Sequence, residues 1–302
     1  MPALQKAIRG GSASHAFHSI AQRRIFSEVY LADWLTTQVA VKVLLVGQVA
    51  NASDAQRALS LSMPIMQRLE AEASLLASLR HPHIVQFVAI CRDPPCIVTE
   101  FCAHGSLAEV LAKARSDPAM AAHLTWARRL AMAADAAAGM LYLHTRTPSP
   151  VVHRDLKSPN LLVDASWTVT DFGIARIVED AAHSGGSMAA MNPRWLAPEL
   201  MQGHRATPAS DVYAFSVVLH ELLTWQLPWG STNPWQLVNH VLSGGRLEVP
   251  SREALPGPDT AAFGGLEAYI SLMQRCWAQE PGQRPAFQQI VLELRALLEQ
   301  AP

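Results

Sequence analysis

Residues 153–160 read His-Arg-Asp-Leu-Lys-Ser-Pro-Asn, and Asp171-Phe172-Gly173 begins eleven residues after the asparagine. Transfer of a phosphoryl group needs a carboxylate to orient the attacking hydroxyl, a cation to spread the transferring charge, and oxygen ligands for magnesium. Those groups are present in these two strings on Asp155, Lys157, Asn160 and Asp171. A tight loop would aim the first three side chains into one small volume, and the end of a neighbouring strand would bring the fourth. The spacing therefore predicts a phosphoryl-transfer site that uses Mg²⁺.

Composition limits the class of protein. The chain has 302 residues, of which 50% are apolar and 16% are charged, as expected for a well-buried globular protein. A formal net charge of −1 gives no overall attraction to nucleic acid or anionic lipid, so we expect no nucleic-acid partner. The alanine-rich stretch 130–143 is interrupted by Asp135 and Gly139, and no stretch is long and apolar enough to predict a membrane span.

The cysteines and the amino-terminal segment bear on the compartment. The four cysteines lack the paired spacing of a metal site, and no secretory hydrophobic segment is present, which predicts reduced thiols and a cytoplasmic location. The first acidic residue is Glu28, and basic residues such as Arg23 and Arg24 precede it. An organelle transit peptide is the alternative interpretation of this segment.

Hydrophobic patterns predict a small strand-rich part followed by a larger helical part. Residues 1–21 are expected to form a disordered tail. The predicted strands are 29–31 and 39–43, joined by a hairpin around 33–37, and then 84–90 and 96–100. The predicted helices are 64–80, 124–144, 210–224, 233–243, 266–277 and 285–299. A linker is expected at 100–105.

The ordered set of motifs resembles the eukaryotic protein kinases from about residue 25 to residue 300. Val39-Ala40-Val41-Lys42 is similar to the strand whose lysine holds the nucleotide phosphates, and Glu72 matches the helix glutamate that pairs with that lysine. Ala197-Pro198-Glu199 is similar to the end of the activation segment. The resemblance implies an α+β, bilobal fold, with an antiparallel β-sheet N-lobe carrying one main helix and a larger, mostly α-helical C-lobe.

Further motifs point to a subgroup and to boundaries. Ser210-Asp211-Val212-Tyr213 and Arg275-Cys276-Trp277, with Arg284-Pro285, resemble the tyrosine kinase-like group, which includes Raf-like and mixed-lineage kinases. Lys157 favours serine/threonine specificity by that resemblance, and Arg284 is expected to pair with Glu199. The implied kinase domain covers 22–302, with an N-lobe at 22–100, a hinge at 101–105 and a C-lobe at 106–302.

The resemblance also implies a role for each site residue. Asp155 would accept the proton of the substrate hydroxyl, Lys157 would offset charge on the γ-phosphoryl group of ATP, and Asn160 with Asp171 would hold Mg²⁺. Lys42 paired with Glu72 would fix the nucleotide phosphates. The remaining predicted nucleotide contacts are Val29, Ala40, Thr99 at the gatekeeper position, Glu100, Cys102, Ser106 and Leu162.

Two departures from the family pattern bear on activity. Gln22, Arg24 and Ser27 stand where the nucleotide-covering hairpin of the family has three glycines, and glycine lets bare backbone approach the phosphates. We therefore expect weakened ATP affinity. Asn192 stands where serine/threonine kinases commonly have a hydroxyl residue.

Three hypotheses for function follow. The first is an active serine/threonine kinase with protein substrates, acting in signal transduction. The alternative is a pseudokinase that serves as a scaffold or allosteric module, and a small-molecule kinase of similar fold is a third hypothesis. Ser184 and Ser187 lie between Asp171 and Glu199, where phosphate added by an upstream kinase or by the protein itself could pair with Arg154. The other interpretation is that both serines simply occupy a loop.

Overall fold

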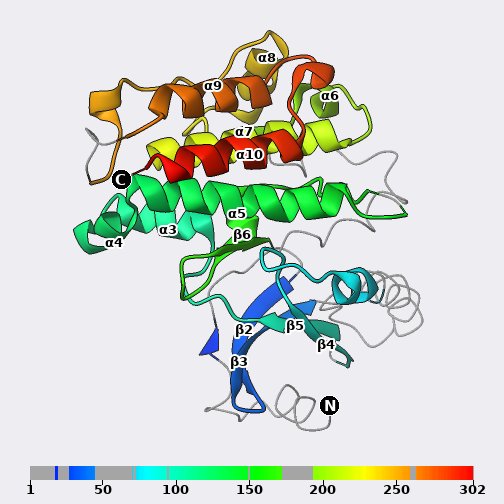
Figure 1. Ribbon diagram of the computed structural model, residues 1–302. Coiled ribbons are helices and arrows are strands. Elements are labelled where there is room, and N and C mark those ends of the chain that lie inside the picture. Colours follow the sequence, from blue (N-terminus) through cyan, green and yellow to red (C-terminus); the bar gives the residue numbers. More distant parts are fainter. Residues whose placement is uncertain are drawn as a thin grey trace. The chain divides into compact units, whose positions relative to one another are not determined.

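The chain divides into two compact units, drawn in blue to cyan and in green to red in the ribbon diagram (Figure 1). The computed structural model describes residues 18–19, 27–44, 70, 73–93, 95–148, 150–171, 193–258 and 263–301. The smaller unit comprises Met1–Arg80 and Ile84–Cys102, and the larger comprises His81–His83 and Ala103–Pro302. Each unit has its own secondary structure.

A five-stranded antiparallel sheet in the order β1-β2-β3-β5-β4 forms the described part of the small unit. Its strands are β1 (His18–Ser19), β2 (Ser27–Trp34), β3 (Thr37–Leu44), β4 (Phe87–Arg92) and β5 (Pro95–Glu100). The predicted hairpin is confirmed, and Leu35 and Thr36 form its turn with φ angles of 47° and 70°. Positive φ at both turn positions matches the twist of the flanking strands.

Two predictions about this unit need correction. His18 and Ser19 lie within the range expected to be a disordered tail, but they pair with Leu31 and Tyr30 of β2, whose edge offers unpaired backbone groups. The strand expected at 84–90 begins only at Phe87 and continues to Arg92, because residues 82–83 form a turn and Ile84 makes only an isolated bridge. Of the helix predicted at 64–80, residues 70 and 73–78 are helical, and its start lies outside the described residues.

The two faces of this sheet have different roles. Directly paired residues of antiparallel strands point to the same face, and successive residues alternate. One face is the apolar core of the unit, which contains Ala32, Val39, Val41, Ala89, Cys91, Cys96 and Val98. Lys42 pairs with Val29 on one side and with Ile97 on the other, and Ala40 pairs with Thr99. These residues therefore lie on the face opposite to that core.

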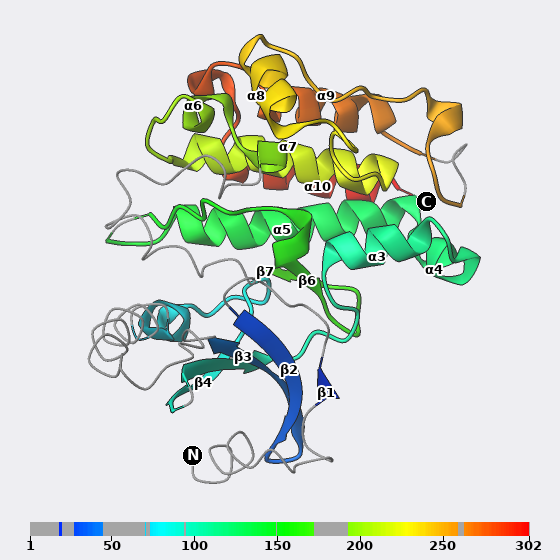
Figure 2. The same cartoon turned by 180° about the vertical axis from the view of Figure 1, so that it is seen from behind.

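The large unit is mainly helical and also holds a two-stranded antiparallel sheet of β6 (Leu161–Val163) and β7 (Val169–Asp171). Its helices are α3 (Leu107–Ala114), α4 (Pro118–His123), α5 (Trp126–His144), α6 (Pro198–Met201), α7 (Pro208–Thr224), α8 (Pro234–Leu242), α9 (Leu266–Cys276) and α10 (Phe287–Glu299). Helix α10 packs along α5, and α9 packs on α7. Seen from behind, the β6–β7 hairpin lies beside α3 and α5 (Figure 2).

The long helices lie where the sequence predicted them, and their ends follow from capping residues. Helix α5 begins at Trp126 rather than at residue 124, because the Thr125 hydroxyl accepts a hydrogen bond from Arg128 N and caps the first turn. Helix α7 begins two residues earlier than predicted, because Thr207 and Ser210 form a capping box around Pro208. Helices α3, α4 and α6 were not predicted.

Candidate active site

Three residues of the predicted loop converge on one carboxylate in the large unit. The Lys157 ammonium donates to both Oδ1 and Oδ2 of Asp155, at 2.8 Å each. The Asn160 amide Nδ2 donates to Asp155 Oδ2 at 3.0 Å and to the Asp155 carbonyl at 2.7 Å. The short 3-10 turn Ser158–Asn160 brings Asn160 back toward Asp155. The predicted convergence of these three residues is therefore present.

A buried carboxylate holds the backbone of this loop. Asp211 of α7 accepts hydrogen bonds from the backbone N–H groups of His153 and Arg154, at 2.8 Å each. Its Oδ2 atom also lies 2.8 Å from Nε2 of His144, at the end of α5. Arg154 has a φ of 67°, a left-handed conformation that few non-glycine residues adopt. The hydrogen bonds from His153 N and Arg154 N to Asp211 hold the backbone at this residue and maintain the turn that presents Asp155.

The backbone of Asp171 lies next to the same loop. Strand β7 ends at Asp171, which pairs with Leu161 in the β6–β7 ladder, and Leu161 directly follows Asn160. Directly paired residues of antiparallel strands have Cα atoms about 5 Å apart. The backbones that carry Asn160 and Asp171 are therefore neighbours, while the position of the Asp171 side chain lies outside the description.

The donor atoms fit a magnesium ion. Asn160 is oriented so that Nδ2 faces Asp155, which turns its carbonyl oxygen away from that carboxylate. An amide oxygen and a carboxylate are hard oxygen ligands, which Mg²⁺ prefers and usually supplements with waters and substrate phosphates. Asn160 and Asp171 are therefore suitable residues to hold Mg²⁺.

In the small unit, the predicted nucleotide residues gather on one face and at one strand end. Val29, Ala40, Lys42 and Thr99 share the sheet face opposite to the core, as the register requires. Glu100 ends β5, and its carboxylate accepts a hydrogen bond from Gln86 N at 2.8 Å. Cys102 follows two residues later and is buried. A lysine ammonium on this sheet face could bind the phosphates of a nucleotide that lies against the face.

Two further predicted nucleotide residues belong to the large unit. Ser106 and Leu162 face each other in an isolated antiparallel bridge. The Ser106 hydroxyl caps α3, because it accepts from Glu109 N at 3.3 Å and donates to Glu109 Oε2 at 2.7 Å. Its side chain therefore has a structural task in addition to the predicted one.

Several predicted residues lie outside the described residues. They include Glu72, the partner expected for Lys42, and Ser184, Ser187 and Asn192 of the segment before Glu199. Gln22 and Arg24 of the predicted nucleotide-covering hairpin also lie outside the described residues, whereas the backbone of Ser27 is part of β2.

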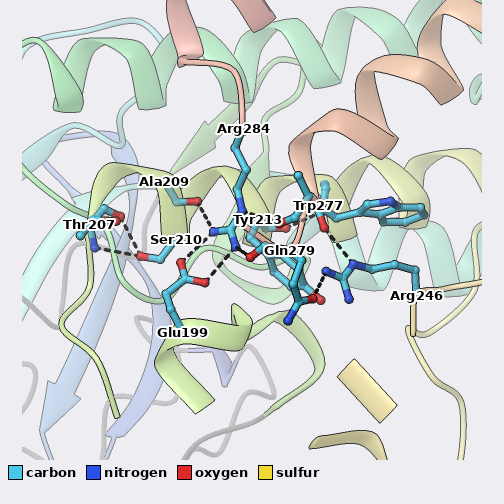
Figure 3. Close-up of polar contacts among 11 residues, drawn as sticks. Glu199, Thr207, Ala209, Ser210, Tyr213, Arg246, Trp277, Gln279 and Arg284 are labelled. Atoms are coloured by element: carbon cyan, nitrogen blue, oxygen red, sulfur yellow. Dashed lines mark hydrogen bonds and ion pairs between the residues drawn. The ribbon is translucent and has the colours of Figure 1, made fainter. Parts of the chain in front are cut away.

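The predicted Glu199–Arg284 ion pair is confirmed (Figure 3). Arg284 donates from Nη1 to Glu199 Oε1 at 2.7 Å and from Nη2 to Glu199 Oε2 at 2.9 Å. The guanidinium also lies 5.2 Å from the ring centre of Tyr213, whose other neighbour is Arg246 at 5.4 Å. This bidentate pair fixes the start of α6, and with it the preceding residues Trp195 and Leu196.

A small cavity of about 30 Å³ in the large unit lies beside Asp155. Charged groups of Arg154, Asp155 and Lys157 line it together with apolar groups of Trp195, Leu196 and Leu200. A chain that placed a hydroxyl at Asp155 would lie against these apolar side chains. The surroundings of Asp155 therefore combine charged and apolar groups.

The supporting roles of Asp211, His144 and Glu221 were not predicted from the sequence. Asp211 and Glu221 are acids in a helix whose residues from Ser210 to Thr224 are all buried. Acids almost never lie buried without a partner, so their presence in an apolar helix was a usable signal for long-range contacts. The identity of the partners, which lie 26 to 67 residues away in the chain, required the structure.

Known proteins are similar in sequence to this chain over most of its length. The model of the protein tyrosine and serine/threonine kinase family matches residues 18–294. Serine/threonine-protein kinase CTR1 of Arabidopsis thaliana is 40% identical over 281 residues, and probable serine/threonine-protein kinase drkD of Dictyostelium discoideum is 35% identical over 279 residues. Each alignment covers 91% of this chain, but 31% and 19% of those two relatives.

A third relative gives the same result. Probable serine/threonine-protein kinase SIS8 of Arabidopsis thaliana is 37% identical over 277 residues, which are 90% of this chain and 24% of that protein. The chain thus spans less than a third of the length of each of these relatives. None of the helices within the described ranges is long and apolar enough to cross a membrane. From its motifs, its fold and the family match, the chain belongs to the protein tyrosine and serine/threonine kinase family.

Proposed function

We propose that this chain is the catalytic domain of an ATP-dependent serine/threonine protein kinase, which transfers the γ-phosphoryl group of ATP to hydroxyls of other proteins in signal transduction. The observation that carries the proposal is the Asp155 carboxylate, held by Lys157 and Asn160 on a loop anchored to Asp211. The names of the relatives support serine/threonine specificity, as does Lys157. The domain boundaries we propose are 22–100 for the N-lobe, 101–105 for the hinge and 106–302 for the C-lobe.

The catalytic steps follow from the residues of the loop. Asp155 accepts the proton of the attacking hydroxyl and holds its oxygen in line with the transferred group. Lys157 offsets the negative charge that spreads over the phosphoryl oxygens. Asn160 and Asp171 would hold Mg²⁺, which neutralises charge on the phosphates when it is bound. Because Asp155, Lys157 and Asn160 already contact one another in the folded chain, little reorganisation of these three groups is needed during the reaction.

Nucleotide binding is assigned to the residues predicted from the sequence. Lys42, paired with Glu72, would fix the α- and β-phosphates. Val29, Ala40 and Leu162 would contact the adenine ring, with Thr99 beside it as the gatekeeper. The backbones of Glu100 and Cys102 would hydrogen-bond to the adenine, and Ser106 would lie near the ribose. The small-unit members of this set share one sheet face or follow the end of β5, which supports the assignment.

Regulation and location complete the proposal. Phosphate on Ser184 or Ser187, added by an upstream kinase or by autophosphorylation, would pair with Arg154 and order the segment before Glu199. We place the protein in the cytoplasm, because its four cysteines are buried thiols, as in proteins of reducing compartments. The pseudokinase alternative is motivated by the missing glycines at positions 22, 24 and 27, whereas the assembled loop of Asp155, Lys157 and Asn160 favours an active kinase.

A phosphate-transfer assay tests the proposal. Purified protein is incubated with labelled ATP, Mg²⁺ and a generic basic protein, in parallel with the Asp155→Asn variant. We expect Asp155→Asn to lower incorporation by at least about 10²-fold, because positioned general bases contribute about 10² to 10⁴ in rate. Glu267→Gln, at an exposed position on α9, is the matched control and should keep the wild-type rate. Equal incorporation by wild type and Asp155→Asn would contradict catalysis by this loop.

A further inference from the structure

Two side chains bind the backbone of strand β7 beside α5 (Figure 2). Val163 lies opposite Val169 in the β6–β7 ladder, but it directs its own N–H and C=O to the backbone of residues 104–105. The Val169 N–H instead donates to Oδ2 of Asp135 on α5 at 3.2 Å, and the Val169 C=O lies 3.2 Å from Nδ1 of His83. Both polar groups of this backbone position therefore depend on side chains from other segments of the large unit.

The same two side chains also contact each other. Nε2 of His83 lies 3.5 Å from Oδ1 of Asp135, an ion-pair distance if the imidazole is charged. The exposed fractions of the two side chains are 18% and 23%, so water screens the contact only in part. A closed ring of contacts thus runs from the Val169 C=O through His83 and Asp135 back to the Val169 N–H.

This ring of contacts requires one titratable proton. Each ring nitrogen of His83 faces an oxygen that accepts hydrogen bonds, one on Val169 and one on Asp135. A neutral imidazole has a single N–H, so either neutral tautomer directs a lone pair at one of these two oxygens. Both contacts are attractive only when one further proton is present, on the imidazole or on the Asp135 carboxyl. The geometry therefore indicates a proton that His83 and Asp135 share.

The neighbouring titratable groups leave this proton on the pair. Burial and the charge of His83 lower the pKa of His81, whose Nδ1 accepts a hydrogen bond from His83 N at 3.1 Å. Burial raises the pKa of the Asp135 carboxyl against the opposing effects of His83 and a backbone hydrogen bond, and Asp164 adds to the rise. The Tyr142 ring of α5 stacks on His81, with ring centres 5.0 Å apart. His81 is therefore the neutral histidine of the segment, and the extra proton lies between His83 and Asp135.

We propose that the proton shared by His83 and Asp135 is a pH-sensitive clamp on β7, and that its loss as the pH rises weakens Mg²⁺ binding at the end of this strand. Strand β7 ends at Asp171, two residues after Val169. The clamp is complete while the pair holds the proton and is lost as the pH rises through the range in which histidine titrates, about pH 5 to 8. The inference rests on the proposed function, which assigns Asp171 to Mg²⁺. His83 and Asp135 do not touch the reacting atoms and are positioning residues.

Two substitutions separate the shared proton from the other properties of the pair. In Asp135→Asn, the amide nitrogen donates a permanent hydrogen to Nε2 of a neutral His83, and the amide oxygen accepts from the Val169 N–H. The variant therefore completes the ring at high pH, where wild type loses it. His83→Asn keeps an N–H for the Val169 C=O but removes the ion pair and its titration. His204→Asn, at an exposed position after α6, is the control for loss of a histidine.

The first test needs neither metal nor nucleotide. Chemical denaturation from pH 6 to pH 8.5 gives the folding equilibrium constant of each protein. We expect the ratio of wild type to Asp135→Asn to fall about fivefold over this range, the factor typical of one partly exposed ion pair. The ratio of wild type to His204→Asn should change less than about twofold.

Nitrogen NMR of histidine-labelled wild type tests the proton directly and does not depend on any variant folding. At pH 6 we expect hydrogen on Nδ1 of His83, with Nε2 either protonated or accepting the proton of Asp135. A neutral His83 that carries hydrogen on Nε2 alone at pH 6 would overturn the clamp. Parallel stability curves of wild type and Asp135→Asn would overturn it as well.

Steady-state kinetics at pH 6.5 and pH 8.5, with Mg²⁺ varied at fixed ATP, test the link to Asp171. We expect the KM for Mg²⁺ of wild type, divided by that of Asp135→Asn, to rise about fivefold between these pH values, while the same ratio for the protein substrate stays within about twofold. His83→Asn should have the raised KM for Mg²⁺ at both pH values. A constant ratio for Mg²⁺ would overturn the link. If wild type transfers no phosphate at any pH, the proposed function and the link to Mg²⁺ fail together, whereas NMR and denaturation still decide whether the clamp exists.

Discussion

Two ion pairs in the large unit contain the same chemical groups but differ in burial. Arg284 and Glu199 have side-chain exposures of 0% and 10%, whereas Arg275 and Glu293 have exposures of 40% and 33%. Removing one partner of a buried pair leaves a buried charge uncompensated. We therefore expect Glu199→Gln to lower the free energy of unfolding by about 3 kcal/mol or more. The corresponding change at the exposed pair, Glu293→Gln, should cost less than about 1 kcal/mol.

Urea denaturation of the two variants measures this difference. The Glu293→Gln variant removes the same charge from the same type of pair, so it is the matched control. Similar losses in both variants would show that burial does not determine the strength of the Glu199–Arg284 contact.

The buried carboxyl of Glu221 predicts a pH dependence of stability. Its pKa is raised from 4.5 to about 8 by burial, so the folded chain retains a proton that the unfolded chain has already released between these values. The contribution of Glu221 to the free energy of unfolding should therefore be greatest below pH 4.5. It should decrease as the pH rises from 4.5 through about 8. The loss amounts to about 1.4 kcal/mol for each unit of pKa difference.

Glu221→Gln isolates this contribution, because it keeps the shape and the hydrogen bonds to Ser158 and Trp195 but does not titrate. Unfolding free energies of variant and wild type are measured by chemical denaturation from pH 5 to pH 9. The unfolding free energy of the variant minus that of wild type should increase with pH up to about 8 and then stay constant. Parallel curves over the whole range would rule out titration of Glu221 in this window.

Single residues with chemical signatures were the easiest part of the site to predict. Asp155, Lys157 and Asn160 could be predicted because a short loop brings residues two to five positions apart into contact. The partner of Arg284 was predicted correctly from motif resemblance. Contacts of His144 and Glu221 could not be predicted, because a buried polar side chain can pair with any segment that the fold brings near it.

At the scale of elements, the long helices could be predicted from the sequence and the short helices could not. Long helices such as α5 and α7 were predicted because their apolar periodicity is sustained over four or more turns. Their ends differed by about two residues, where Thr125 and Thr207 act as caps. Helices α3 and α4 were missed because they are 8 and 6 residues long, too short for a clear period. Their caps, Ser106 and Asp117, were the available signals.

Helix α5 also binds a short segment from an earlier part of the chain. His81 stacks on Tyr142 with ring centres 5.0 Å apart, and Nε2 of His83 lies 3.5 Å from Asp135. Between them, Gly139 lets the segment approach closely, because a Cβ at that position would lie 2.7 Å from the backbone oxygen of His83. This docking explains why residues 81–83 belong to the large unit.

The close approach at Gly139 predicts the effect of one added methyl group. In an isolated helix, Gly139→Ala would stabilise by about 1 kcal/mol through helix propensity. Here the methyl group meets backbone rather than a movable side chain, so residues 81–83 or α5 must shift. Overpacking of this kind costs about 1–3 kcal/mol, and we expect a net loss in thermal stability.

Differential scanning calorimetry of Gly139→Ala tests this expectation. Gly282→Ala is the control, because a Cβ there would meet no atom within 4 Å. A rise in the melting temperature of Gly139→Ala would mean that the segment yields easily and that the docking is weak.

At the scale of the whole molecule, the parts of the proposed function come from both units. Lys42 belongs to the sheet of the small unit, and the catalytic loop belongs to the large unit. The sequence predicted both sets, because each motif is local. The contacts that hold the catalytic loop in the large unit could not be predicted in the same way. His144, Arg154 and Asp211 come together only when α5, the loop and α7 have packed.

Ligand binding to the folded chain provides the last prediction. A ligand that binds only the native state stabilises it by RT ln(1 + [L]/Kd), about 2.7 kcal/mol at a concentration of 100 Kd. Mg²⁺ with ATP should therefore raise the melting temperature of wild type by about 5 °C near saturation, because about 1 kcal/mol corresponds to roughly 2 °C in a chain of this size. Glycine is absent at positions 22, 24 and 27, so we expect the shift to require high ATP concentrations.

Substitutions at Lys42 and at Asp171 test which residues cause the shift in melting temperature. Lys42→Met should abolish the shift with ATP, because the phosphates lose their cation. Asp171→Asn should keep the shift with ATP alone but lose the increment that Mg²⁺ adds, because a carboxylate is replaced by a neutral amide. Glu267→Gln, at an exposed position, should behave like wild type. If Mg²⁺ and ATP leave the wild-type melting temperature unchanged at millimolar concentrations, the chain does not bind nucleotide. An equal shift in wild type and Lys42→Met would place the nucleotide away from the sheet face that carries Lys42.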